Sequence, residues 1–185
     1  MAGSIFKPST PTSGEKLCRS AKDCKGMAIV QNDFSRHFEH RLSVLKGFLD
    51  CPREPEFRNV YNAAIDGAIV TCRSLWELMG VIVDSRKETA PHAPSVRLKA
   101  EKNPPPKQVG NLTITQFTET DLDQLQQSRG QLYDDLRRVL VAGNKCVAHM
   151  DEFPDHGVEH SVLERATKFT LSEVPRRVPN LKLNR

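Results

Sequence analysis

A short polar run in the C-terminal half of the chain carries the side chains best suited to chemistry. Asn144, Lys145 and His149 lie within six residues of one another. A histidine can move a proton near neutral pH, and asparagine or lysine can donate hydrogen bonds to an oxyanion. On a straight helix Lys145 and His149 lie one turn apart on one face, about 6 Å along the axis. These side chains make the run the part of the sequence best suited to acid–base and oxyanion chemistry.

The polar run lies at the end of a long amphipathic segment, residues 118–151. Its apolar residues recur at alternating steps of three and four, which predicts one helix with a face toward the core. Thr118 is the expected N-cap, with Asp121 three residues later. Two positions of the apolar series hold Arg129 and Gly143 instead.

Three further helices are predicted, over residues 32–50, 56–84 and 157–173, each from its apolar stripe. The short proline-containing turn after residue 50 makes the first two an antiparallel hairpin. Residues 85–117 are rich in proline and lysine and predict a loop, with an extended piece at 111–115. The expected fold is all-α.

In more detail, we expect an up-and-down bundle of four main helices, with the Pro-rich basic loop between helices 2 and 3. The second helix and residues 119–149 should be the two longest helices and should pack antiparallel. A chain of 185 residues suits one domain. The predicted division is a flexible tail (1–26), a single helical domain (27–175) and a basic tail (176–185).

Composition limits the compartment and the class of protein. No apolar run is long enough for a membrane span or a signal peptide, so we expect a cytoplasmic protein with no membrane contact. The five cysteines are odd in number and include no Cys-x-x-Cys pair, which indicates free thiols in a reducing compartment. No cofactor is indicated.

Positive charge gathers in the irregular segments. Residues 1–32 hold five basic and two acidic side chains, and residues 85–118 hold six and two. An anionic partner such as RNA could be met there, although basic segments also keep proteins soluble. The candidate RNA-binding residues are Lys99, Lys102, Lys107 and Arg138.

The run 144–149, near the end of a long helix in a small bundle, and the run 73–78 together resemble the HEPN superfamily. The resemblance is closest to members associated with abortive infection and toxin–antitoxin systems, and it covers roughly residues 30–175. It implies a helical bundle that dimerises and a metal-independent RNase site. Asn144 matches the family's polar position, Lys145 a common accompaniment, and His149 the catalytic histidine.

The arginine that precedes the polar position in the family is replaced by Gly143. Glycine offers no guanidinium to a phosphorane, and losing one such electrostatic group commonly costs on the order of 10²–10³ in rate. We therefore expect a protein that binds RNA, or cleaves it weakly as a degenerate RNase, in a defence or toxin–antitoxin setting. The alternative is a non-catalytic interaction module whose partner is an antitoxin or a second copy.

Two further interpretations concern a zinc-motif spacing that does not amount to a zinc site and a purely structural role for Gly143. His156, Glu159 and His160 match a His-x-x-Glu-His zinc motif, although no third ligand of the expected kind follows well downstream. Gly143 can equally mark a place where a facing helix approaches closely, in which case an arginine there would overpack the core.

Overall fold

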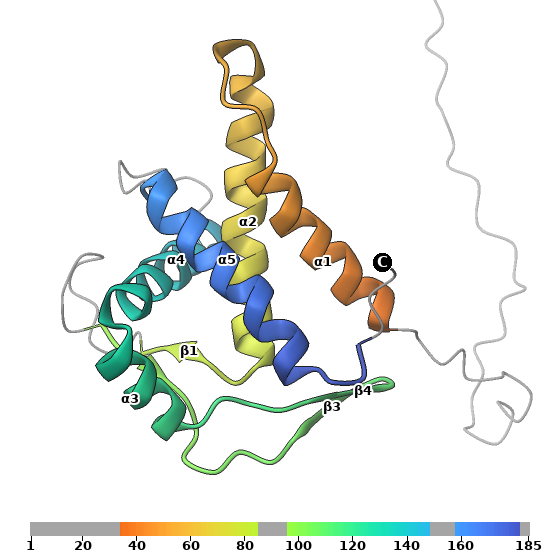
Figure 1. Cartoon of the computed structure of the whole chain (residues 1–185), viewed down its shortest axis with the longest axis vertical. Helices are drawn as coiled ribbons and strands as arrows, with labels where there is room; N and C mark the ends of the chain where they lie inside the picture. The colour runs from red at the N-terminus through yellow and green to blue at the C-terminus, as the bar shows by residue number, and fades with distance from the viewer. Residues whose placement is uncertain (1–33, 85–95, 149–157, 182–185) are drawn as a thin grey trace, which may run out of the picture. The chain divides into compact units, whose positions relative to one another are not determined.

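The computed structural model describes residues 34–84, 96–148 and 158–181, without the side chains of residues 145–148. Figure 1 shows the elements in this order: α1 (Phe34–Leu49), η1 (Pro55–Phe57), α2 (Arg58–Leu78), β1 (Ile82–Val83), β2 (Leu98–Lys99), β3 (Lys107–Val109), β4 (Leu112–Ile114), α3 (Glu119–Ser128), α4 (Gly130–Ala148) and α5 (His160–Arg177). The first predicted tail, residues 1–26, lies outside the described residues.

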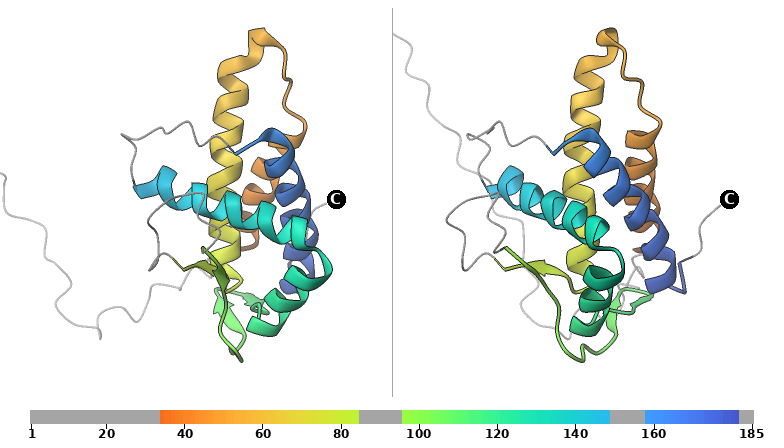
Figure 2. Two further views of the ribbon diagram at one scale, coloured as in Figure 1. Left: turned by 90° about the vertical axis from the view of Figure 1, so that its left-hand side faces the viewer. Right: turned by 60° about the vertical axis from the view of Figure 1, so that its left-hand side comes forward.

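Helix α2 contacts α1, α4 and α5 and so forms the centre of the helical core. Its side chains Leu75 and Trp76 are fully buried, and so are Leu136 and Val139 of α4. These contacts were predicted, but the antiparallel arrangement is wrong, because α4 runs across α2 and not alongside it (Figure 2). A crossing brings a short stretch of each helix into close approach.

The helical hairpin at the start of the domain follows the sequence closely. Phe38, Leu42 and Leu45 are buried as their spacing predicted, while Phe48 is buried in place of Leu49. Pro55 begins η1, where its missing N–H is no loss. The end of the hairpin where α1 is connected to α2 is exposed. Val60, which was expected on the apolar face of the second helix, is 60% exposed there.

Residues 118–148 form two helices, so the prediction of one unbroken helix is wrong. The start is as expected, with the Thr118 hydroxyl accepting from the Asp121 amide and the Asp121 carboxylate accepting from the Thr118 amide. The break falls at Arg129, whose backbone has φ −143° and ψ 51°. Gly130, a poor helix former, follows directly. Helix α4 then starts afresh at Gly130.

Two small antiparallel sheets lie between α2 and α3 in the chain. Strand β1 pairs with β2, and β3 pairs with β4. The predicted extended piece is confirmed as β4, where Leu112 and Ile114 are fully buried against the helices. The described part of the chain is therefore mainly helical, with five α-helices and two short sheets in place of a pure four-helix bundle.

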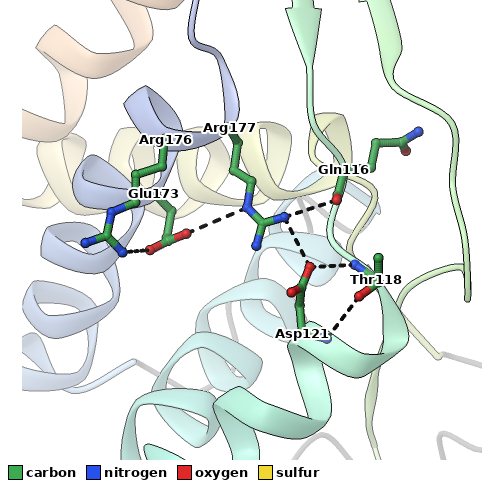
Figure 3. A network of polar contacts seen from close by, with 6 residues as sticks. All are labelled: Gln116, Thr118, Asp121, Glu173, Arg176 and Arg177. Atoms are coloured by element: carbon green, nitrogen blue, oxygen red, sulfur yellow. Dashed lines mark hydrogen bonds and ion pairs between the residues drawn. The ribbon is translucent and has the colours of Figure 1, made fainter.

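Helix α5 is joined to the start of α3 through Arg177 (Figure 3). The Arg177 guanidinium lies 3.8 Å from the centre of the Phe117 ring and donates to the Gln116 carbonyl at 3.1 Å. It also pairs with Asp121 at 3.1 Å and with Glu173 at 3.8 Å. One arginine thus fixes the α3 N-terminus against the last turn of α5.

The last helix extends beyond its predicted end at residue 173, because α5 continues through Pro175 to Arg177. Val178, in the predicted basic tail, is buried in the core. Cys51 and Cys72 are free thiols, and burial raises the pKa of the Cys72 thiol to about 11, so it stays protonated. Within the described residues, no helix has the length and apolar character needed to cross a membrane.

Candidate functional site

Gly143 is the point of closest approach between α2 and α4. A Cβ atom built on Gly143 would lie 2.9 Å from Cβ of Arg73 and 3.1 Å from its Cδ. Real Cβ atoms do not approach so closely, so the stem of Arg73 fills the space that a side chain at position 143 would occupy. The expectation that a facing helix approaches this glycine is therefore confirmed.

The guanidinium of Arg73 is held at this crossing by two contacts. Its Nη1 donates to the carbonyl oxygen of Gly143 at 3.1 Å, and its Nε donates to Oε1 of Glu77 at 2.8 Å. Arg73 and Glu77 lie one turn apart on α2, as the sequence indicated. The link to Gly143 was not predicted, because no sequence spacing relates positions 70 residues apart.

An arginine therefore stands beside position 143 although the chain has none at that position. The Arg73 side chain is 24% exposed and the Glu77 side chain 44% exposed, so both are open to solvent in part. In the described part of the chain, the two contacts use Nε and Nη1 and leave Nη2 without a partner. A guanidinium nitrogen without a partner can donate a charged hydrogen bond to a phosphate oxygen.

The three predicted catalytic residues are only partly described. Asn144 follows Gly143 in α4 and is half-buried, so its backbone adjoins the residue that Arg73 contacts. Lys145 also belongs to α4, but its side chain is outside the described residues. His149 lies wholly outside them. The structure thus places one of the three predicted residues next to an arginine that sequence reasoning did not assign to the site.

The four candidate RNA-binding residues come from separate elements and are all exposed. Arg138 is on α4, and Lys107 is on β3. Lys99 of β2 forms an ion pair with Asp84, and Lys102 follows β2. Their role in RNA binding stays a prediction.

Of the residues with His-x-x-Glu-His spacing, Glu159 and His160 are described. His160 begins α5, and its Nδ1 lies in hydrogen-bond contact with the Tyr61 hydroxyl. Its Nε2 lies 3.3 Å from Oε2 of Glu164, and its ring packs 5.4 Å from that of Phe48. These contacts explain His160 as a link between α5 and the helical hairpin, while His156 is outside the described residues. The described ranges contain no group of three possible metal ligands.

In comparisons with known proteins, no family model, curated protein or solved structure matches this chain.

Proposed function

We propose that this chain is a HEPN-like protein that binds RNA and cleaves it weakly, with Arg73 supplying the guanidinium that position 143 lacks. The proposal keeps the defence or toxin–antitoxin setting that the resemblance implies. The observation that carries it is the contact of Arg73 with Gly143, at 3.1 Å between Nη1 and the carbonyl oxygen. The guanidinium reaches the same crossing from α2 that a family arginine would reach from α4.

The chemistry would use the two helices together. Attack by the RNA 2′-hydroxyl forms the bond from O2′ to phosphorus, breaks the bond to O5′, and places negative charge on the phosphorane. Arg73 would donate to the phosphorane oxygens, and Asn144 would add a neutral donor. His149 would accept the 2′-hydroxyl proton and then return it to O5′ as the bond from phosphorus to O5′ breaks. No metal or cofactor takes part in these steps.

An exchange of the arginine between helices tests this assignment. Arg73→Ala removes the guanidinium but keeps the Cβ atom that an added Cβ at position 143 would meet at 2.9 Å. Arg73→Gly with Gly143→Arg removes that Cβ as well and returns a guanidinium from α4 into the vacated space. Cleavage of a fluorescent single-stranded RNA, and melting temperature, are measured for both variants and for wild type.

We expect Arg73→Ala to lower cleavage by about 10²-fold, as loss of one oxyanion donor does. The double variant should recover part of that loss, and adding His149→Ala to it should remove the recovery. Arg36→Ala, an exposed arginine on α1, is the matched control and should leave cleavage unchanged. A folded Arg73→Ala protein that binds and cleaves RNA as well as wild type would rule out the role of Arg73.

A second candidate function, docking of a protein partner, is favoured by the exposed apolar residues of the hairpin end. Phe57 is 43% exposed and Val60 is 60% exposed, both near the start of α2. Further along, Val70 and Ile82 are 37% and 53% exposed. A second copy is the partner that the family resemblance implies, and sedimentation at micromolar protein should then show a dimer that Val60→Asp weakens. A monomer of 20.8 kDa for the wild type would count against this candidate.

A further inference from the structure

A groove lies at the opposite end of α4 from Gly143. It has a volume of about 620 Å³ and opens between the first turns of α4 and the middle of α5. Its lining residues are Arg129, Gly130, Gln131, Leu132, Asp135, Arg165, Lys168, Phe169 and Ser172. Ligand pockets in proteins are commonly about 300–1,000 Å³, so a small organic ligand fits.

One wall of the groove contains a carboxylate that is completely buried. Asp135 of α4 is 0% exposed, yet its partner Arg165 on α5 is 46% exposed. Nε of Arg165 donates to Oδ2 at 2.6 Å, and Nη2 donates to Oδ1 at 3.1 Å. Gln131 adds a third hydrogen bond, from Nε2 to Oδ1 at 3.0 Å. The buried carboxylate therefore holds the guanidinium in one orientation at the groove.

Stability alone does not account for this pair. Burying a carboxylate has a large desolvation cost, and well-packed apolar side chains usually stabilise such a position as well as an ion pair does. What the pair supplies, and an apolar pair would not, is a positioned cation at a solvent-filled groove. The pairing leaves Nη1 of Arg165 without a partner among the described residues.

The charges around the groove favour an anion. Arg129, Arg165 and Lys168 line it, against the single acidic residue Asp135. The first turn of α4, which also lines it, contains no acidic residue, and the N-terminal end of a helix dipole adds to a positive potential. Lys168 pairs with Glu164 at 2.6 Å, and Glu159 and Glu164 also act electrostatically on Arg165, although neither glutamate is part of the lining.

The rest of the lining is apolar or aromatic. Leu132 is half-buried and Phe169 is 8% exposed, so each shows an edge to the groove. Gln131 and Ser172 add neutral hydrogen-bonding groups. A ligand that satisfies this lining has a compact anionic group and a flat body with a few polar atoms.

We propose that this groove binds a nucleotide, with the phosphate between Arg129, Arg165 and Lys168 and the base against Leu132 and Phe169. The same unit occurs as a free nucleotide and within single-stranded RNA. Base contacts with aromatic side chains and phosphate contacts with arginines are the usual means of binding such units. This site is separate from the Arg73 region and does not depend on RNA cleavage there.

The test measures binding of AMP, GMP, CMP, UMP and a short fluorescent single-stranded RNA to the full chain, by calorimetry and anisotropy. Arg129→Gln with Lys168→Gln removes two cations and leaves the Asp135 pair intact. Asp135→Leu with Arg165→Met replaces the ion pair by apolar residues and so keeps the fold without the guanidinium. Arg176→Met, on α5 with a side chain 72% exposed and outside the groove, is the matched control.

Each double variant should weaken binding by about tenfold or more, because each lost charged hydrogen bond matters by about that factor, while Arg176→Met leaves it unchanged. Binding of a mononucleotide identifies a small-molecule site, and binding of RNA alone identifies a contact along a strand. Equal affinity in wild type and both double variants would overturn the proposal. So would binding of a poly-glutamate peptide with none of any nucleotide. RNA cleavage that persists in the groove variants leaves the proposed function standing, so the two proposals fail separately.

Discussion

Arg73 of α2 and Arg165 of α5 both contact α4, but their guanidinium groups are held there by different kinds of contact. Arg73 is held by a backbone carbonyl and by Glu77 of its own helix, and it fits because residue 143 has no side chain. Arg165 is held by Asp135, a side chain buried on the other helix. Asp135 and Gly143 are eight residues apart on α4, about 12 Å along the axis. The first arrangement depends on close approach, and the second depends on charge.

This difference predicts which amino-acid substitutions each of the two regions tolerates. A close approach fails when any atom is added, whatever its charge, because the stem of Arg73 already fills the space. A buried ion pair fails when either charge is removed alone, since the remaining charge is left without a partner. Substitutions at these two places should therefore show opposite patterns of tolerance.

The largest effect is expected from the core residue that both regions share. Leu136 is completely buried on α4, between Asp135 and the Gly143 crossing. Leu136→Ala should lower the free energy of unfolding by about 2–5 kcal/mol, from lost burial and the cavity left behind. Urea denaturation measures this change. A loss below about 1 kcal/mol would mean that α4 repacks easily and is a poor support for either site.

The second-largest change in stability is expected at Gly143, and Gly130 of the same helix provides the comparison. Gly143→Ala should destabilise by about 1–3 kcal/mol, because its Cβ would meet Cβ of Arg73 at 2.9 Å. Gly130, at the groove end, has nothing within 4 Å of an added Cβ. Gly130→Ala should therefore change stability by between zero and about 1 kcal/mol in the favourable direction. Thermal melts of the two variants side by side decide it, and equal melting temperatures would contradict the close approach.

Sequence reasoning succeeded where a signal is local. The Thr118 and Asp121 capping box lies within one helical turn, and it is confirmed. The burial of Leu136 and Val139 followed from apolar periodicity. Gly143 in an apolar series also gave a usable signal, since an interrupted stripe marks either a break or a close approach.

Contacts between residues far apart in the sequence could not be predicted from such local signals. The helix break at Arg129 was missed, although Arg129 interrupts the apolar series, because the helical spacing of apolar residues resumes beyond it at Leu132 and Leu136. Asp135 reads as a solvent-facing residue, and only its partner on α5 explains its burial. The pairing of Arg73 with Gly143 depends on the crossing of two helices. Sequence spacing within one helix does not encode these relations.

A smaller effect is expected at low pH, which should destabilise the N-terminal end of α3 before it affects the contact between Arg73 and Gly143. Burial alone would raise the pKa of Asp121, but hydrogen bonds from Thr118 and the contact with Arg177 outweigh it and lower the pKa. A lowered pKa contributes stability above the unfolded value, near about 3.9, and that stability is lost as the pH falls through the native pKa. The carbonyl of Gly143 does not titrate.

Asp121→Asn should therefore destabilise by about 0.5–1 kcal/mol at pH 7, as loss of a capping contact does. The gap between wild type and variant should close as the pH drops below about 4. Urea melts at several pH values measure the gap. A gap that stays constant down to about pH 2 would show that the Asp121 charge is not what stabilises the start of α3.

The smallest effect decides whether one RNA strand contacts both regions. For single strands, each phosphate contact adds about 0.7 to the slope of log affinity against log salt. If a strand spans the Arg73 crossing and the groove, Arg73→Gln and Lys168→Gln should each lower the slope by about 0.7, and the double variant by about 1.4. If the groove instead holds a separate nucleotide, only Arg73→Gln should change the slope for RNA.

Anisotropy titrations over a range of salt concentrations measure these slopes, with Arg36→Gln on α1 as the control of equal charge. The control should leave the slope of the wild type unchanged, because Arg36 lies on a helix that contributes to neither region. Identical slopes for wild type, Arg73→Gln and Lys168→Gln would mean that neither arginine-bearing region touches the RNA backbone. The Arg73 crossing and the Asp135 pair would then have to be explained as structural contacts alone.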